Sequence, residues 1–286
     1  MTRVVSPLSL MALLLFDASR LATADETQET DAAIRPTQVI ELFNGRDLTG
    51  FTTWLRDTKH EDPRGVFSVA DGMIRISGDG FGGLITEKAY RDYHLVVEFK
   101  WGKRTWEPRK DRTMDSGVLV HCVGPPGNAG GGAWMASIEC QVIEGGVGDF
   151  IVIGGQYTDG SSVPVSLTCE TTKDRDGENV WKKNAKRQVF RGGRINWFGR
   201  DPDWKDVLGF RGKRDVESPA GEWTRLEVFC DGPSIRNYVN GVAVNEGTDA
   251  FPAAGRILLQ CECAEIFFRK IELRPLAGDD AKADRP

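Results

Sequence analysis

The residues best suited to chemistry lie in one run, Ser-Ile-Glu-Cys-Gln-Val-Ile-Glu-Gly-Gly, at residues 137–146. Because side chains alternate between the two faces of a β-strand, Glu139 and Gln141 share one face, and the apolar residues between them take the other. Strict alternation places Glu144 on the apolar face, and a β-bulge near Ile143 would return it to the polar face. The run therefore predicts a strand with two glutamates on its polar face.

Two glutamates in this arrangement resemble the E-x-D-x-x-E strand of laminarinase-type retaining glycosidases. Those enzymes hold two carboxylates about 5 Å apart, one as the nucleophile and the other as the acid/base. Gln141 takes the place of the middle aspartate, and an amide cannot share a proton with the nucleophile. The alternative is a polar face that binds a ligand without catalysis, and the run leaves both interpretations open.

Two further segments add polar candidates. Gln260 and Glu262 are two residues apart, so they share a face that Leu259 and Cys261 do not. His121 ends an apolar run just before a glycine-rich loop. A histidine at a loop edge is placed to carry a proton or to ligate, although a purely structural histidine is the alternative.

A second group of residues is predicted to bind substrate rather than to react. Eight tryptophans are many for this length, and indoles in loops can stack on sugar faces or simply cap the edge of a sheet. Residues 159–221 are rich in charge and tryptophan and are predicted to be an insertion that folds over the ligand face. The binding candidates are Trp134, Trp197, Arg200, Asp201, Trp204, Arg211, Asp215, Glu98 and Lys100.

The elements that must position these residues are short β-strands. Alternating runs are separated by glycine-rich turns, with 33 glycines in the chain, and no sustained helical periodicity is present. Asp71-Gly72 and Asn240-Gly241 are typical of tight hairpin turns. We therefore expect an all-β sandwich of two antiparallel sheets, formed by one domain over residues 39–276. Residues 25–38 are expected to be a flexible leader, and residues 277–286 a disordered tail.

The N-terminus is typical of a secretory signal peptide. Arg3 precedes a mostly apolar stretch at residues 4–16, and Ala22-Thr23-Ala24 has the form of a cleavage site. The apolar stretch is shorter than the ~20 residues that a membrane-spanning helix needs. We expect residues 1–24 to be removed and the protein to be exported, periplasmic or secreted, with no membrane span after processing. An uncleaved anchor is the alternative.

Charge and cysteine content restrict the partners and the chemistry. The formal net charge is −5, and no stripe of lysine and arginine is present, which excludes nucleic acid as a predicted partner. Six cysteines permit disulfides in an exported chain, and buried free thiols are the equal alternative. Cys261 and Cys263 share a strand face and are poorly placed to bond each other.

Several motifs, in order along residues 39–276, resemble the 3-keto-disaccharide hydrolase domain family. The opening Leu-Phe-Asn-Gly-Arg-Asp-Leu-Thr-Gly-Phe at residues 42–51 is similar to its "LFNGKDLSGW". The further matches are Asp71-Gly72, residues 83–86, residues 93–101, Asp115-Ser116-Gly117 where the family has Asn-Ser-Gly, Glu139-Cys140-Gln141, Gly221-Glu222-Trp223, Val239-Asn240-Gly241, residues 255–260 and residues 268–273.

The resemblance implies a concanavalin A-like jelly-roll sandwich that cleaves glycosidic bonds of sugars oxidised at C3. The ketone acidifies the C2 hydrogen, a base removes it, the glycosidic oxygen leaves, and water adds back. Such a site needs a base, an acid and an electrophile for the ketone oxygen. The base and acid candidates are Glu139, Glu144 and Glu262, and the orienting or ketone-binding candidates are Gln141, Gln260 and His121.

Three questions stay open at this point. The cofactor is unknown, and a divalent metal ion held by these side chains is the alternative electrophile. A conventional retaining hydrolase that uses Glu139 and Glu144 is the second hypothesis. A non-catalytic glycan-binding module is the third. All three hypotheses predict a carbohydrate as the partner.

Overall fold

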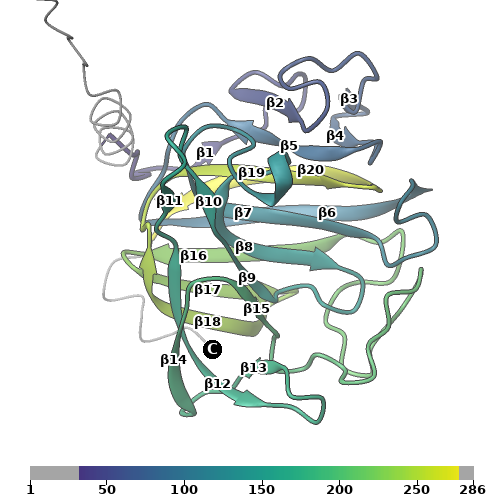
Figure 1. Cartoon of the computed structure of the whole chain (residues 1–286). Helices are drawn as coiled ribbons and strands as arrows, with labels where there is room; N and C mark the ends of the chain where they lie inside the picture. The colour runs from purple at the N-terminus through teal and green to yellow at the C-terminus, as the bar shows by residue number, and fades with distance from the viewer. Residues whose placement is uncertain (1–31, 277–286) are drawn as a thin grey trace, which may run out of the picture.

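The computed structural model describes residues 32–276, so the expected signal peptide, most of the leader and the expected tail lie outside it. Two large sheets dominate the described chain, and all the strand pairings within them are antiparallel (Figure 1). One 3₁₀ turn, Gly130–Gly132, accompanies them. No helix among these residues is long and apolar enough to cross a membrane. The prediction of an all-β sandwich is confirmed.

The larger sheet has eleven strands, some paired as hairpins and others paired with strands far away in the sequence. Its main path runs through β13 (Asn179–Trp181), β12 (Ser166–Lys173), β18 (Val242–Phe251), β17 (Ser234–Val239), β16 (Thr224–Asp231), β6 (Tyr93–Thr105), β20 (Ala264–Pro275), β4 (Met73–Ile76) and β3 (Phe67–Ala70), while β1 (Ile40–Glu41) pairs with β20 and β14 (Lys186–Phe190) pairs with β12.

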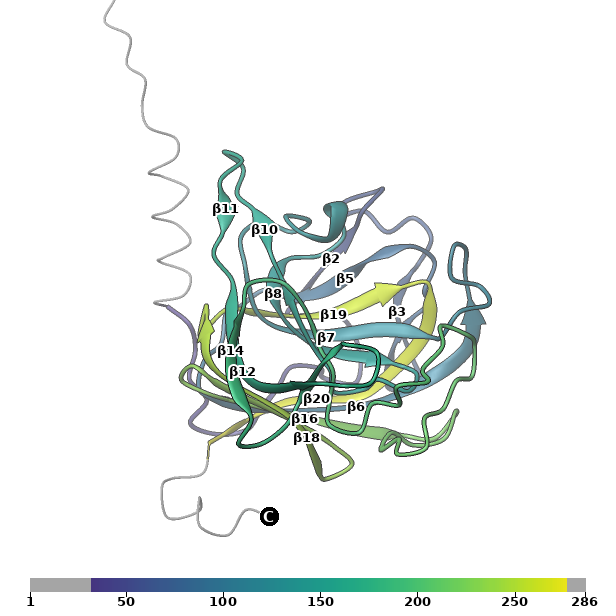
Figure 2. The same ribbon diagram turned by 60° about the horizontal axis from the view of Figure 1, so that its bottom comes forward.

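The smaller sheet has seven strands and carries the candidate site. Its order is β15 (Gly193–Ile195), β9 (Phe150–Ile153), β8 (Ala136–Ile143), β7 (Asp115–Val123), β19 (Arg256–Glu262), β5 (Phe81–Thr86) and β2 (Phe51–Leu55). A separate ribbon, β10 (Gly155–Gln156) with β11 (Ser162–Val163), projects beyond the body of the sandwich (Figure 2).

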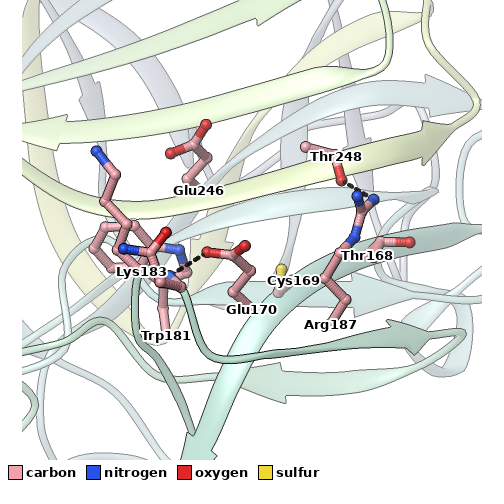
Figure 3. A pocket seen from close by; sticks show the side chains of 9 residues that line it. Thr168, Cys169, Glu170, Trp181, Lys183, Arg187, Glu246 and Thr248 are labelled. Atoms are coloured by element: carbon pink, nitrogen blue, oxygen red, sulfur yellow. Dashed lines mark hydrogen bonds between the residues drawn. The ribbon is translucent and has the colours of Figure 1, made fainter.

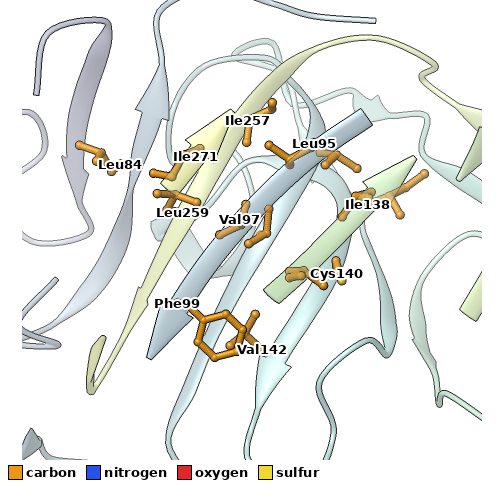
Figure 4. Close-up of a cluster of buried hydrophobic side chains, with 14 of the residues drawn as sticks. Leu84, Leu95, Val97, Phe99, Ile138, Cys140, Val142, Ile257, Leu259 and Ile271 are labelled. Carbon is orange, nitrogen blue, oxygen red and sulfur yellow. The ribbon is translucent and has the colours of Figure 1, made fainter. Parts of the chain in front are cut away.

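The core lies between the two sheets and follows the predicted alternation. On β8, Ile138, Cys140 and Val142 are buried and pack with Val97 and Phe99 of β6 in one cluster (Figure 4). Burying an aliphatic or aromatic side chain of this size stabilises the fold by about 1.5–3 kcal/mol. Because the apolar residues of β8 are committed to the core, the intervening polar residues must take the outer face of the smaller sheet.

The structure corrects the interpretation of residues 159–221 as an insertion beside the sandwich. Strands β12 and β14 extend the edge of the larger sheet, and β15 extends the smaller sheet. Leu167 and Cys169 of β12 even join the core. Within this segment, residues 196–221 form no strand. Short, charged strands such as Lys186–Phe190 lack the apolar alternation by which a strand is recognised in sequence.

The six cysteines are buried free thiols. Burial raises the pKa of the Cys122 and Cys230 thiols to about 12, so they are neutral at any physiological pH. Of the two alternatives that the sequence left open, the structure has free thiols rather than bridges.

Candidate active site

The outer face of the smaller sheet gathers polar residues from three neighbouring strands, β8, β7 and β19. Gln141 faces Gly117 across the β8–β7 pair, and Asp115 faces Glu262 across the β7–β19 pair. Glu139 and Gln260 share this outer face with them, because Ile138, Cys140, Leu259 and Cys261 all belong to the core. The structure thus brings together Glu139 with Gln141 and Gln260 with Glu262, the two pairs that alternation each placed on one strand face.

Gly117 makes room for the Glu139 carboxylate. A Cβ atom at residue 117 would lie 2.1 Å from Oε1 of Glu139 and 2.8 Å from its Cδ, far inside van der Waals contact. The Glu139 side chain therefore reaches across β7 toward β19 only because residue 117 has no side chain.

Asp115 is the centre of a hydrogen-bonded group that the sequence analysis missed. Nε2 of Gln141 donates to Oδ1 of Asp115 over 2.6 Å, and Nη2 of Arg109 lies 3.0 Å from Oδ2. Nη2 of Arg109 also lies 3.4 Å from Oδ1 of Asp206. Arg109 comes from the loop between β6 and β7, where no strand periodicity pointed to it. The Asp-Ser-Gly motif was the only signal for Asp115.

Two acceptor atoms at this face have no hydrogen-bond partner. Oε1 of Glu139 and Oε1 of Gln260 are both buried and unpaired, and the two residues are only 2% and 1% exposed. An unsatisfied buried polar group costs about 1–3 kcal/mol, so a protein seldom retains one without a bound molecule to satisfy it. These two atoms are therefore where a substrate hydroxyl would be expected to donate a hydrogen bond.

Burial sets the protonation of the three carboxyls. It raises the pKa of Glu139 well above its usual value, and the charges of Glu262 and Asp115 raise it further. Burial likewise raises the pKa of Glu262 to about 7, against the attraction of Arg109 and Arg194. Burial and the charge of Glu262 raise the pKa of Asp115. The group therefore holds fewer than three negative charges at neutral pH, so a proton donor and a proton acceptor coexist.

Arg194 is a second cation near this face that sequence reasoning missed. It faces Ile151 across β15–β9, and Ile151 in turn faces Glu139 across β9–β8. Its Nη1 lies 2.8 Å from Oδ2 of Asp149. Arg194 favours the ionised forms of Glu139 and Glu262. Arg200, a predicted binding residue, also forms an ion pair with Asp149 and so helps to hold the carboxylate that Arg194 contacts.

An aromatic edge borders the polar residues on the β5–β2 side. Phe81 faces Glu262, and Trp54 faces Gly83. The predicted binding residue Trp134 packs edge-on against Phe81, with ring centroids 6.3 Å apart. Trp54 joins Trp134 in packing on a separate apolar cluster outside the main core. Sugar rings stack on such indoles.

The structure contradicts the assignment of His121 as a proton carrier. A bulge between Val120 and Val123 and a φ of +55° at His121 interrupt the alternation. The ring is fully buried beside Tyr93, and Nδ1 lies 3.0 Å from the Pro252 carbonyl oxygen. Burial lowers the pKa of His121 to about 4, so the ring is neutral at physiological pH.

This burial predicts a loss of stability in acid. The pKa of His121 in the folded protein lies below the ordinary 6.5. Its contribution to the free energy of unfolding is therefore fully present above pH 6.5 and is lost as the pH falls toward 4. Between pH 6.5 and 4, the free energy of unfolding should therefore fall by about 3 kcal/mol less in His121→Gln than in the wild type. Denaturant unfolding at several pH values measures it, with the exposed His60→Gln as the control. A wild-type slope retained by His121→Gln would contradict the burial of a neutral ring.

Glu144 does not join Glu139, and no bulge returns it to the polar face. β8 ends at Ile143, and Oε2 of Glu144 accepts the backbone N–H groups of Met114 and Gly209, each over 2.9 Å. Its own carbonyl accepts from Nε1 of Trp204 over 2.9 Å. Glu144 therefore anchors the loop that follows β15, and burial raises its pKa. Glu144 does not reach the polar face because it lies in the turn after β8, where side chains no longer alternate between two faces.

The remaining binding candidates in residues 159–221 make contacts that stabilise the loop itself and are not arranged to bind a ligand. Trp197 is 1% exposed and belongs to the core. Trp204 stacks under Arg200, with 4.4 Å from Cζ to the ring centroid. The others bond to backbone groups of the same loop: Asp201 to Asp203 and Lys213, Asp215 to Gly212, and Arg211 to Glu217 and Ser218.

The burial of Trp197 predicts a large stability effect. Trp197→Ala should lower the free energy of unfolding by about 3–5 kcal/mol, because a large cavity opens in the core. The half-buried Trp204→Ala should cost about 1 kcal/mol. Denaturant unfolding followed by circular dichroism measures both. Native stability in Trp197→Ala together with a lost sugar affinity would restore the surface role that the sequence suggested.

Glu98 and Lys100 lie on the wrong side of the sandwich for this site. Both face outward from β6 in the larger sheet, since Val97 and Phe99 take the core side. Glu98 pairs with Arg225 and Arg269, over 3.4 and 2.6 Å. Alternation placed these residues on a polar face, but it could not tell which of the two sheets β6 belongs to.

The polar face does not fit a divalent metal ion. Among residues 32–276, no group of three or more His, Cys, Asp and Glu side chains is arranged to hold one. Both oxygens of Asp115 are already engaged: Oδ1 accepts a hydrogen bond from Gln141, and Oδ2 forms an ion pair with Arg109.

Comparisons with known proteins identify the family. The 3-keto-alpha-glucoside-1,2-lyase-like domain matches residues 38–274. No curated protein matches the chain. Similar structures include a protein from Parabacteroides distasonis provisionally assigned as a glycosyl hydrolase, 18% identical over 84% of this chain and 94% of that one, with a TM-score of 0.45. A β-glucanase from Bacillus licheniformis is 12% identical over 85% and 100%, with a TM-score of 0.43. The chain is an antiparallel β-sandwich and belongs to the 3-keto-alpha-glucoside-1,2-lyase-like domain family.

Proposed function

We propose that this protein cleaves the glycosidic bond of a 3-keto-glycoside by elimination followed by hydration, at the outer face of the smaller sheet. Membership of a carbohydrate-active family supports the substrate class. The observation that carries the proposal is the gathering of three carboxyls with raised pKa values. Asp115 and Glu262 face each other across β7 and β19, and the Glu139 carboxyl lies against Gly117. Acid/base chemistry needs such groups, and a purely structural face does not.

In the proposed reaction, Glu262 is the base. A pKa of about 7 keeps a large fraction ionised at neutral pH and still makes it a competent proton acceptor. It removes the C2 proton that the neighbouring ketone acidifies. The electron pair moves to the ketone oxygen as an enolate, and then returns to form the C1–C2 double bond as the C1–O bond breaks.

Glu139 is the acid in this proposal. Its pKa lies well above the usual range, so it is protonated at neutral pH and can donate to the departing glycosidic oxygen. Nε of Arg109 is buried without a hydrogen-bond partner, which makes it the donor for the enolate oxygen. Gln260 binds a sugar hydroxyl through its unpaired Oε1. Gln141 fixes Asp115 through a hydrogen bond, and Asp115 in turn pairs with Arg109 and holds it in place.

The two other hypotheses gain less support. A retaining mechanism with Glu139 and Glu144 lacks its second carboxylate, because Glu144 is bonded to the backbone of Met114 and Gly209. A glycan-binding module would have no reason to retain carboxyls of raised pKa. An aryl glucoside assayed with and without prior oxidation at C3 separates the three. Release of the aryl group from the oxidised substrate alone supports the proposal, release from the unoxidised one supports a retaining hydrolase, and binding without release supports the module.

We also propose that the enzyme acts outside the cytoplasm, on the basis of the N-terminal sequence. Mass spectrometry of the protein recovered from the periplasm or the medium should show Asp25 as the first residue. Recovery of the intact chain in the membrane fraction would contradict this expectation.

A further inference from the structure

A basic groove lies on the outer face of the larger sheet, on the opposite side of the sandwich from the proposed active site. Its volume is about 630 Å³, within the range of small-molecule sites. Lys100 and Phe267 form part of its wall and face away from the core, because their neighbours Phe99 and Phe268 face inward. Its charged lining consists of Arg75, Lys100, Lys103, Arg104 and Glu265.

The groove carries positive charge that the protein does not neutralise. Glu265 is already committed, since Oε1 pairs with Arg75 over 2.7 Å and Oε2 accepts the Lys103 backbone N–H over 3.0 Å. Within residues 32–276, the side chains of Lys100, Lys103 and Arg104 form no ion pair. Three free cations on a chain of net charge −5 favour an anionic ligand at this place.

Aromatic rings orient one of these cations and provide an apolar surface beside it. Phe267 faces Arg75 on one side and Lys100 on the other. Nζ of Lys100 lies 4.9 Å from the centroid of Trp223 and 5.8 Å from that of Phe267, which is cation–π distance. A ligand that suits this lining has an apolar face for Phe267 and anionic groups for the cations, as a charged sugar ring does.

Trp101 also lines the groove, but it faces the other way from Lys100 and packs in the core with Phe99. It is 6% exposed, so it adds buried apolar surface beside the cations.

A smaller pocket at the edge of the larger sheet shows the contrast (Figure 3). It has a volume of about 220 Å³. Glu170 accepts the Asn184 backbone N–H over 2.6 Å, and Arg187 donates to Thr248 over 3.0 Å and pairs with Asp249 over 2.8 Å. Two of its charged side chains are thus already satisfied by neighbours, whereas Lys100, Lys103 and Arg104 of the basic groove form no ion pair within residues 32–276.

We propose that the basic groove is a second carbohydrate site, which binds an oligosaccharide bearing carboxylate or sulfate groups. The choice of a sugar rests on the proposed carbohydrate activity, but the site does not depend on the catalytic roles. It would hold an acidic polysaccharide while the opposite face acts on a glycoside, so the two sites can be tested separately.

The test measures binding of four probes by isothermal titration calorimetry. They are a uronate tetrasaccharide, a sulfated galactan tetrasaccharide, neutral cellotetraose and a thymidine tetranucleotide. The groove variant is Lys100→Gln/Lys103→Gln/Arg104→Gln. The control, Lys173→Gln/Lys182→Gln/Lys186→Gln, removes the same charge from exposed positions at the far edge of the same sheet.

We expect one or both acidic sugars to bind the wild type and the control, and to bind the groove variant about tenfold more weakly. High salt should weaken the same binding. Turnover of a small 3-keto aryl glucoside should be unchanged in the groove variant, which separates this site from the active site. Equal affinity in both variants, equal affinity for cellotetraose or the nucleotide, or no binding of either acidic sugar would each overturn the proposal.

Discussion

Glu262→Gln and Glu139→Gln should each lower the turnover of a 3-keto-glycoside by about 10²–10⁴-fold, while the melting temperature stays near that of the wild type. The reason is that each substitution removes a proton-transfer group and keeps the volume of the side chain. The measurement is kcat on an aryl 3-keto-glucoside. Glu144→Gln is the matched control, because its carboxylate binds two backbone N–H groups and should affect stability rather than turnover.

The pH profile distinguishes the two carboxyls. Because Glu262 must be ionised to act as the base, turnover should rise with pH through a limb near its pKa of about 7. Glu262→Gln should lose that limb, and Glu139→Gln should keep it on a lower plateau. If both variants retain near-native turnover, this face does not supply the acid/base chemistry.

Gly117→Ala should lower turnover by about 10²-fold, although it adds a single methyl group. The new Cβ would lie 2.1 Å from Oε1 of Glu139, so the carboxylate must move away from its present position. A displacement of about 1 Å in a catalytic group can cost this much. Gly154→Ala is the control, since a Cβ there meets nothing within 4 Å. Native turnover in Gly117→Ala would show that the position of Glu139 is not critical.

The central polar face could be predicted from the sequence because the alternation of side chains along a strand depends only on residues that are adjacent in the chain. Glu139 and Gln141 lie on the outer face since the residues between them are core residues, and the same holds for Gln260 and Glu262. Asp115 completes the group through the register between β7 and β19, which joins residues far apart in sequence. No local pattern contains that pairing, so Asp115 was not predicted.

The errors have local physical causes. His121 left the expected face because a bulge interrupts β7, and Glu144 did so because β8 ends one residue earlier. Glu98 and Lys100 were assigned to the right kind of face on the wrong sheet, which only the strand order decides. Trp197 is a core residue within a segment whose charge content suggested a surface loop. Arg109 lies in a loop without periodicity, and Arg194 in a strand too short to be recognised.

The central claim is tested most directly by the fate of the C2 hydrogen. The wild-type enzyme acts on an aryl 3-keto-glucoside in D₂O, and the released 3-keto sugar is examined by NMR beside a time-matched sample without enzyme. Elimination and hydration replace the C2 hydrogen with deuterium as water adds back. The proposal predicts deuterium at C2 in the enzymatic product, and loss of both this product and its deuterium in Glu262→Gln. A product that retains hydrogen at C2 would contradict it.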